Sequence, residues 1–545
     1  FTDCYFRANR ESMDQKSFEQ FETLCSAVFG NVGTGNTAEA REMLESICLH
    51  PSFVEKSETV FENSKNIYAL HCAGTSLTRL MTDYWNNYDD DQKLRIRDFI
   101  LQYLIKNGPE LPSHITTTLC TLICRITSLS WMTDTRERNI LDLMLQYTKS
   151  RDNCIIALTV LEELVAQMIP KKTSTQQQNK AALQFRESNL FNITSLAMNM
   201  LHDTFQADDA TVGSAKLRED LYDRSLRLLI RCFSFDCRPA KVEDGLESHP
   251  TLGIPGDWLP QFLTAENLAL LFNIYHHSAA PVTTEVVEAV LWLVCGSRSD
   301  LYSSNVDANI YSVLLEQLLG VLSSGHGLDD LETVHAFCQL LDRYKMLCSV
   351  RMMAEAGFQQ LVALAATFTT TLIGSLYDSA NSLAYLFHFW YRLCQDVGRL
   401  LSDVYSQLSA FLEAQLLVVV EAYLAKRLND VPDWADSAED DPLTATDACY
   451  WELVFLGGMI RFHYNKGMKV VADLYDGVNK EYTSEVRMLN TMKLSGAVNP
   501  ELLGKVRVLE CRLAWLVNVI AATLAGLKFT SNQIEREEEA LDAEL

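Results

Sequence analysis

Apolar side chains recur at helical spacing along almost the whole chain, and this pattern constrains the fold more than any other feature. Ile96, Ile100, Tyr103 and Leu104 form one such stripe, with the spacing i, i+4, then i+7 and i+8. There is no sustained alternation of apolar and polar residues flanked by hairpin turns, so a β-sheet is not supported. Gly (23) and Pro (12) are both scarce, which favours helices joined by short loops. The pattern therefore predicts an all-α protein.

The expected helices come in pairs. Near the start of the chain the predicted pairs are 17–29 with 37–49, 51–62 with 66–84, and 91–106 with 114–130. The period from pair to pair is about 40 residues, which is typical of HEAT repeats. A single pair cannot bury its apolar face, whereas stacked pairs bury a continuous core. Because 545 residues exceed one compact core, we predict a HEAT-repeat superhelical solenoid of the ARM-like, right-handed kind.

Polar and acidic segments interrupt the helical pattern. We predict a first domain of three repeats over 14–131 and further repeats over 132–545. Runs of like charge are typical of solvated loops or of interaction segments. For the two acidic stretches, 430–441 and 533–545, both a solvated loop and an interaction segment stay open. The expected loops lie near 171–180, 237–260, 430–441 and 533–545.

The formal net charge of −25 excludes the basic footprint that nucleic-acid binding requires, and it disfavours contact with anionic membranes. An acidic chain suits partners that carry basic patches.

The 15 cysteines are odd in number and scattered singly through apolar stretches, which predicts free thiols in a reducing compartment. The uncharged stretch 356–377 has its large apolar side chains on one helical stripe. We interpret it as a buried amphipathic helix, and we expect no membrane insertion.

Catalytic motifs were sought and not found. The sequence contains no G-x-x-x-x-G-K-[ST], no H-E-x-x-H and no G-x-S-x-G. The glycine-rich stretch 30–35 lies between two expected helices, and we interpret it as a helix cap and linker. Cys120 and Cys124 are one turn apart, yet no third ligand is near in sequence, which favours two core thiols over a metal site. We therefore predict neither an enzyme nor a bound cofactor or metal.

The first three pairs resemble the importin-β N-terminal domain. The segment AGTSLTRL at 73–80, Trp85 and the segment KLRIRDF at 93–99 carry that layout. Four later segments, in order, resemble exportin-7 and its relatives, Ran-binding proteins 16 and 17. They are RITSLSW at 125–131, CIIALTVL at 154–161, FRESNLF at 185–191 and RLAWLVNVI at 512–520. The chain is thereby similar to the N-terminal half of that karyopherin family, and 14–131 is identified with its importin-β N-terminal-like domain.

The resemblance implies a nuclear transport receptor, an exportin that shuttles between nucleus and cytoplasm. Such a receptor binds Ran-GTP and protein cargo and contacts Phe-Gly nucleoporins. It also implies that the second helix of each early pair meets Ran. The polar residues off the apolar stripes of these helices are then the candidates: Arg41, Glu45, Arg79, Asp83 and Arg125. An acidic loop at Glu439, Asp440 and Asp441 is a further candidate near Ran.

Alternatives remain at this stage. Arg125 could instead pair with a carboxylate of a neighbouring repeat, and Trp131 is better interpreted as a core residue than as a contact. For the whole chain, the alternative function is a static HEAT-repeat scaffold for a cytosolic protein complex. Within the karyopherin class, an importin or another exportin is a further alternative, and the residues do not decide the direction of transport. The residues do not identify the cargo or its signal.

Overall fold

The structure is a computed structural model. It describes residues 13–30, 37–171, 173–208, 212–236, 257–295, 309–348, 350–353, 355–375, 380–398, 406–435, 448–494 and 500–525. Every regular element within these ranges is helical, which confirms the predicted all-α class. The contacts divide the chain into two compact units. The first unit holds Phe1–Glu243 and Pro250–Leu259, and the second unit holds Asp244–His249 and Pro260–Leu545.

The first unit consists of helix pairs in chain order. Its helices are α1 (Gln15–Phe29), α2 (Thr37–Cys48), α3 (Phe53–Asn63), α4 (Ile67–Asp83), α5 (Asp90–Asn107), α6 (Ser113–Ser130), α7 (Asn139–Tyr147), α8 (Cys154–Met168), α9 (Gln176–Phe185), α10 (Phe191–Gln206) and α12 (Ala215–Phe233). Short helical turns join some of them, at Trp85–Asn87, Gly108–Glu110, Thr135–Arg138 and Arg186–Leu190. The three pairs predicted near the start of the chain are confirmed to within a few residues at each end.

Side-chain caps explain where several of these helices begin. The Asp14 carboxylate accepts a hydrogen bond from the Ser17 amide at 3.2 Å, just before α1. Asp89 and Gln92 form a reciprocal capping box at the start of α5, which satisfies two backbone donors that would otherwise lack a partner. These caps place the first apolar residue of each helix, and hence the face that it buries.

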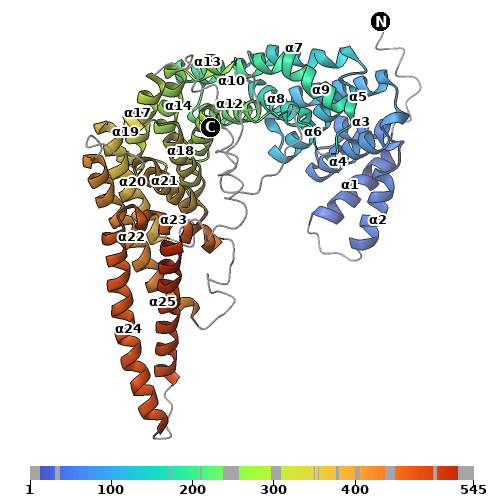
Figure 1. Cartoon of the computed structure of the whole chain (residues 1–545). Helices are drawn as coiled ribbons and strands as arrows, with labels where there is room; N and C mark the ends of the chain where they lie inside the picture. Colours follow the sequence, from blue (N-terminus) through green and yellow to red (C-terminus); the bar gives the residue numbers. More distant parts are fainter. Residues whose placement is uncertain are drawn as a thin grey trace. The chain divides into compact units, whose positions relative to one another are not determined.

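The second helices of successive pairs stack side by side in the first unit. α4 packs on α6, α6 on α8 and α8 on α12, as Figure 1 shows in the blue and green part of the chain. The row continues past 131, the expected end of the first domain, because α6 packs directly on α8. Trp131, at the end of α6, is buried against Phe185 with ring centroids 5.4 Å apart, so its predicted core role is confirmed.

The second unit repeats the same plan with longer helices. Its helices are α14 (Ala265–His277), α15 (Val282–Val294), α17 (Asn309–Ser324), α18 (Leu331–Leu347), α19 (Val350–Met353), α20 (Ala356–Gly374), α21 (Ala380–Gly398), α22 (Ser406–Trp434), α23 (Ala448–Phe462), α24 (Tyr464–Leu494) and α25 (Pro500–Ala525). One turn, α13 (Leu259–Phe262), lies where the two units meet in the sequence.

Two layers run through the second unit. α15, α18, α21, α23 and α25 stack in one layer, and α14, α17, α20, α22 and α24 follow one another in the other. Each pair buries its apolar face against the next, which is the packing of a helical-repeat solenoid. Figure 1 shows α24 and α25, in red, side by side as a long hairpin. The predicted HEAT-repeat solenoid is confirmed.

Two of the expected loops are partly helical. α9 begins at Gln176, inside the polar segment 171–180, because Thr175 and Gln178 form a capping box there. α22 continues to Trp434, inside the acidic segment 430–441, because Val431 and Trp434 are buried and Asp430 pairs with Lys426 at 2.8 Å. Residues 436–447 and 526–545, and most of the segment 237–260, lie outside the described residues.

Two described helices, α20 and α22, are long and apolar enough to cross a membrane by length and composition alone. About half of each apolar window, 50% and 44%, is buried inside the protein. The two helices also pack on each other. Packing of this kind favours the interpretation of 356–377 as a buried amphipathic helix.

The cysteines whose side chains the structure describes carry free thiols, as predicted, and all of them except Cys511 are buried. Burial raises the pKa of the Cys120 thiol to about 12. Such a thiol stays protonated at neutral pH and is a poor nucleophile. These cysteines therefore act as small apolar core residues in the fold.

Candidate partner-binding surface on the first helix pairs

The candidate surface is formed by α2, α4 and α6, the second helices of the first three pairs. α4 and α6 approach closely at Gly74, where an added Cβ would lie 3.1 Å from the Thr118 methyl carbon and 3.2 Å from a Leu119 methyl carbon. α4 and α6 therefore pack directly against each other.

Arg41 and Glu45 lie one turn apart on α2, and both side chains are exposed. Within the described part of the chain neither takes part in an ion pair. A surface charge without an internal partner keeps its hydration in the free protein and is available to an incoming protein. The position of these two residues is compatible with the predicted contact role.

Arg79 and Asp83 form an ion pair along α4. Arg79 Nε lies 3.5 Å from an Asp83 carboxylate oxygen, and the two side chains are 64% and 54% exposed. Exposed pairs at this spacing contribute little to stability. Arg79 and Asp83 can therefore give up their ion pair and contact a partner protein at a small cost in free energy.

Arg125 differs from the other candidates because it is half-buried on α6. It lines a cavity of about 320 Å³ together with Gln167, Lys171 and Gln178. None of the carboxylates in the described residues forms an ion pair with it. The alternative expectation, a structural pair between Arg125 and a carboxylate of the next repeat, therefore has no support among these residues.

A pair of histidines lies on the same row of helices. His71 of α4 and His114 of α6 have ring centroids 5.5 Å apart. Burial lowers the pKa of His71, and the nearby His114 lowers it further. The lowered pKa favours the neutral form of the His71 ring at neutral pH.

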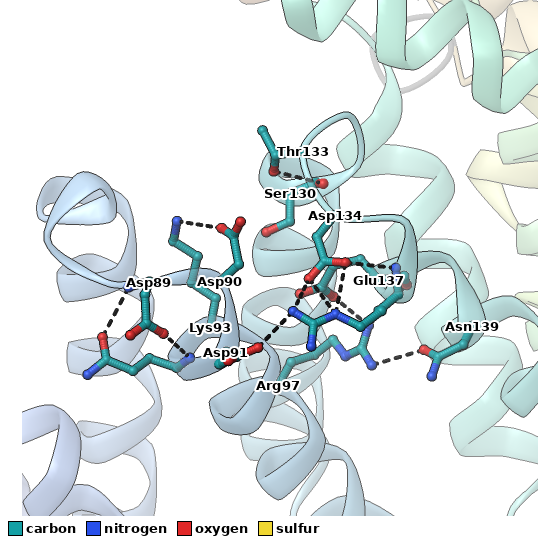
Figure 2. Close-up of polar contacts among 12 residues, drawn as sticks. Asp89, Asp90, Asp91, Lys93, Arg97, Ser130, Thr133, Asp134, Glu137 and Asn139 are labelled. Atoms are coloured by element: carbon teal, nitrogen blue, oxygen red, sulfur yellow. Dashed lines mark hydrogen bonds and ion pairs between the residues drawn. The ribbon is translucent and has the colours of Figure 1, made fainter.

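Arg97, on α5, has a structural role that the sequence pattern does not predict. Its side chain is fully buried and paired with Glu137, which is also fully buried. Figure 2 shows the guanidinium of Arg97 pointing toward Glu137 and Asn139 in the next repeat. The Arg97 Nη1 also donates to the Glu137 carbonyl oxygen at 3.0 Å, and Nη2 donates to the Asn139 side-chain oxygen at 3.0 Å.

The buried ion pair between Arg97 and Glu137 is here called the clamp. The sequence signal available for it is the distance between the two residues along the chain. Arg97 and Glu137 are separated by 40 residues, which equals the repeat period. Burial raises the pKa of the Glu137 carboxyl, and the Arg97 guanidinium opposes that shift. The ion pair fixes α5, the helix that precedes α6, against the turn that leads into α7, and so positions the candidate surface.

A second layer of charges surrounds the clamp at the surface. Arg136 pairs with Asp91 at 2.8 Å and with Asp134 at 2.7 Å. Lys93 pairs with Asp90 at 3.3 Å (Figure 2). The Lys93 ammonium also lies 4.4 Å from the centre of the Trp85 ring. The residues Trp85 and Lys93, which carried the family resemblance, thus have structural contacts with each other.

Two further predictions concern the acidic loop and the absence of a metal site. Glu439, Asp440 and Asp441 lie outside the described residues, so the acidic loop stays a prediction. Within the described residues no cluster of three His, Cys, Asp or Glu side chains is arranged to hold a metal ion.

Family models match two parts of the chain. The importin-beta N-terminal domain matches residues 40–106, which cover α3 and α4, most of α2 and all but the last residue of α5. The TPR domain described as exportin-7-like matches residues 430–545. The two matches lie near the two ends of the chain.

Curated relatives match along nearly the whole chain. Exportin-7-B of Xenopus laevis is 27% identical over 97% of this chain and 48% of its own length. Ran-binding protein 17 of Homo sapiens is 25% identical over 97% of this chain and 48% of its own length. Ran-binding protein 16 of Drosophila melanogaster is 23% identical, with 97% and 47% covered. The chain spans about half the length of the curated relatives it matches.

A crystal structure of importin beta in an ammonium sulfate condition matches 92% of this chain and 67% of its own chain. The sequence identity is 11% and the TM-score is 0.38. The fold assignment rests on the helix contacts described above. The similarity to known families rests on the two domain matches and on alignments that cover 97% of this chain. The chain is similar to exportin-7 and Ran-binding proteins 16 and 17, and it carries matches to an importin-beta N-terminal domain and to an exportin-7-like TPR domain.

Proposed function

We propose that the chain is part of an exportin, a nuclear transport receptor that binds Ran-GTP together with protein cargo. The observation that carries the proposal is the importin-beta N-terminal domain match at 40–106. In addition, 97% of this chain aligns with 48% of exportin-7-B. The names of two relatives, Ran-binding proteins 16 and 17, support Ran as the partner. The stacked helix pairs supply an extended surface of the kind that wraps protein partners.

In this proposal the row of α2, α4 and α6 meets Ran-GTP. Arg41, Glu45, Arg79 and Asp83 contribute exposed charges, and Arg125 contributes a half-buried one. Charges at the rim of an interface mainly raise the association rate and give it a salt dependence. The acidic residues Glu439, Asp440 and Asp441 act as an acidic loop near Ran.

The remaining partners follow from the same proposal. The receptor contacts Phe-Gly nucleoporins, shuttles between nucleus and cytoplasm, and acts without a cofactor or catalytic step. A net charge of −25 fits protein partners with basic patches better than nucleic acid.

A capture experiment tests the proposal. The immobilised chain is incubated with Ran loaded with a non-hydrolysable GTP analogue or with GDP, and the bound Ran is quantified. We expect selective capture of the GTP form. Capture of neither form by this chain or by the full-length protein would favour a static HEAT-repeat scaffold for a cytosolic complex instead.

A further inference from the structure

A small polar cavity lies at the ends of α6 and α8, where the chain turns into α9. Its volume is about 320 Å³, and its walls include Arg125 and Ser128 of α6 and the segment after α8 that contains Lys171 and Ser174. Cavities that bind ligands start at about 300 Å³. This cavity therefore has room for one small ligand.

The charge of the cavity is opposite to that of the chain. Among the described residues that line it, Arg125 and Lys171 are charged and none is a carboxylate, in a protein whose net charge is −25. Within the described residues neither cation forms an ion pair. The nearby Glu163 is held by the Gln167 side-chain amide at 2.9 Å and does not line the cavity. Two cations without an ion-pair partner among the described residues place a positive potential at this point.

Uncharged donors lie beside these two cations. The Ser174 hydroxyl oxygen accepts a hydrogen bond from the Lys171 amide at 2.8 Å, which leaves the hydroxyl hydrogen available. The Gln178 side-chain oxygen accepts from the Thr175 amide at 2.8 Å, which leaves its NH₂ group available. The positive end of the α9 dipole lies at the same place, because α9 begins at Gln176.

We propose that this cavity binds a phosphate monoester, presented as a phosphoserine or phosphothreonine side chain on a segment of a partner protein. A phosphate monoester carries a charge of about −1.5 to −2 and three acceptor oxygens, which match two cations and several neutral donors. The planar fork of Arg125 suits two of those oxygens. A carboxylate, with one charge and two oxygens, leaves donors unsatisfied. Met168 and Pro170 supply an apolar wall for the carbon atoms of the ligand.

This site goes beyond the proposed function, because binding of Ran-GTP does not call for a phosphorylated protein side chain. It shares Arg125 with the candidate Ran surface, whereas Lys171 belongs to the cavity alone. The two proposals can therefore fail separately. Selective capture of Ran-GTP tests the first, and the titrations below test the second without Ran.

Calorimetric titration at low ionic strength tests the cavity. The probes are N-acetyl-O-phosphoserine amide, inorganic phosphate and N-acetyl-glutamate amide. The proteins are the natural chain, Arg125→Gln, Lys171→Gln and the matched control Lys180→Gln. Lys180 is exposed on α9 and does not line the cavity, so its loss removes the same charge at a different place. Far-UV circular dichroism establishes that each variant keeps its helices.

We expect saturable binding of the phosphoserine probe to the natural chain and to Lys180→Gln. Arg125→Gln and Lys171→Gln should each weaken it about tenfold or more, because each removes a charge-assisted contact. The glutamate probe should bind at least about tenfold more weakly than the phosphoserine probe. Affinity for phosphoserine should rise between pH 5.5 and 7.5, because the second phosphate pKa is about 6.

Three results would overturn the proposal. The first is the absence of saturable phosphoserine binding by the natural chain. The second is binding that Arg125→Gln and Lys171→Gln leave as strong as the Lys180→Gln control does. The third is binding of inorganic phosphate without binding of the phosphoserine probe, which would assign the cavity to the free ion.

Discussion

At the scale of single residues, the pair of Arg97 and Glu137 is the charged contact whose loss should affect stability most. Both side chains are fully buried, and the pair joins two successive repeats. Removing one partner of a buried pair leaves the other charge without compensation, which costs about 3–5 kcal/mol. Arg97→Ala should therefore lower the free energy of unfolding by about that amount, as measured by urea denaturation followed by circular dichroism.

The matched control is Arg136→Ala, since Arg136 pairs with Asp91 and Asp134 but is 53% exposed. Exposed pairs contribute little, so its shift should be small. A loss for Arg97→Ala no larger than for Arg136→Ala would show that the buried pair is not a clamp.

The same variant should make stability depend on pH. Burial raises the pKa of Glu137, and Arg97→Ala removes the guanidinium that opposes this shift. The folded variant then binds a proton above the pH at which the unfolded chain releases it, so stability falls as pH rises through that window. The destabilisation should be smaller at pH 5 than at pH 8 in paired denaturation curves. An equal loss at both values would mean that Glu137 stays ionised without its partner.

The cysteines give a second prediction at this scale. Cys48 and Cys72, on α2 and α4, have sulfur atoms 3.4 Å apart. Contact with Cys25 and burial raise the pKa of Cys72 to about 12. Because the thiolate is the reactive form, the buried thiols of the native protein should react slowly with a thiol reagent at pH 8. After denaturation without reductant, all 15 thiols should react. A count well below 15 would reveal disulfides and contradict the reducing compartment.

At the scale of elements, the crossing of α23 and α25 depends on one glycine. A Cβ added at Gly457 would lie 2.9 Å from the carbonyl carbon and oxygen of Ala522, which are backbone atoms of α25 and cannot rotate away. Gly457→Ala should therefore force the two helices apart and destabilise the second unit by about 1–3 kcal/mol.

Gly477→Ala is the matched control for that substitution. Gly477 lies in α24, and nothing is within 4 Å of an added Cβ. Alanine in an open helical position should stabilise by about 0.5–1 kcal/mol. Opposite signs for the two variants in thermal melts are expected. A neutral or stabilising Gly457→Ala would mean that the crossing is looser than described.

Helix positions could be predicted from the sequence because apolar spacing and caps act locally. The pairs 17–29 with 37–49 and 91–106 with 114–130 were found this way, and α1, α2, α5 and α6 match them closely. Loop positions were predicted less well, because polarity alone does not end a helix. The segment 171–180 is polar, yet Gln176 starts α9 once Thr175 and Gln178 cap it. The segment 430–434 is acidic, yet burial of Val431 and Trp434 keeps it in α22.

The candidate site was predictable only in part. The helical stripes identified Arg41, Glu45, Arg79 and Asp83 as residues off the core face, and the structure places all four at the surface. The burial of Arg97 depends on Glu137, 40 residues away, and no local pattern reports such a contact. The cavity at Arg125 likewise requires the ends of α6 and α8 and the start of α9 to meet in space.

At the scale of the whole molecule, the chain spans about half the length of its curated relatives. A receptor that wraps its partner gains from contacts at both ends, because the second contact forms at high effective concentration. Contacts made by the other half of a full-length relative are lacking here. We therefore expect this chain to bind Ran-GTP more weakly than the full-length protein does.

Arg79→Glu tests where on the molecule that binding takes place. Arg79 is 64% exposed and pairs only loosely with Asp83, at 3.5 Å. Charge reversal should weaken Ran-GTP binding and flatten its dependence on salt, because rim charges act mainly through the association rate. Circular dichroism should show unchanged helix content. Binding with the natural affinity and salt dependence would place the contact away from α4.

The measurement that tests the central claim most directly is the affinity of this chain for Ran in its two nucleotide states, by surface plasmon resonance. The account predicts that Ran-GTP binds measurably and more tightly than Ran-GDP, with the preference retained and the affinity increased in the full-length protein. Equal binding of the two forms would contradict it. So would the absence of binding at micromolar concentrations even for the full-length protein.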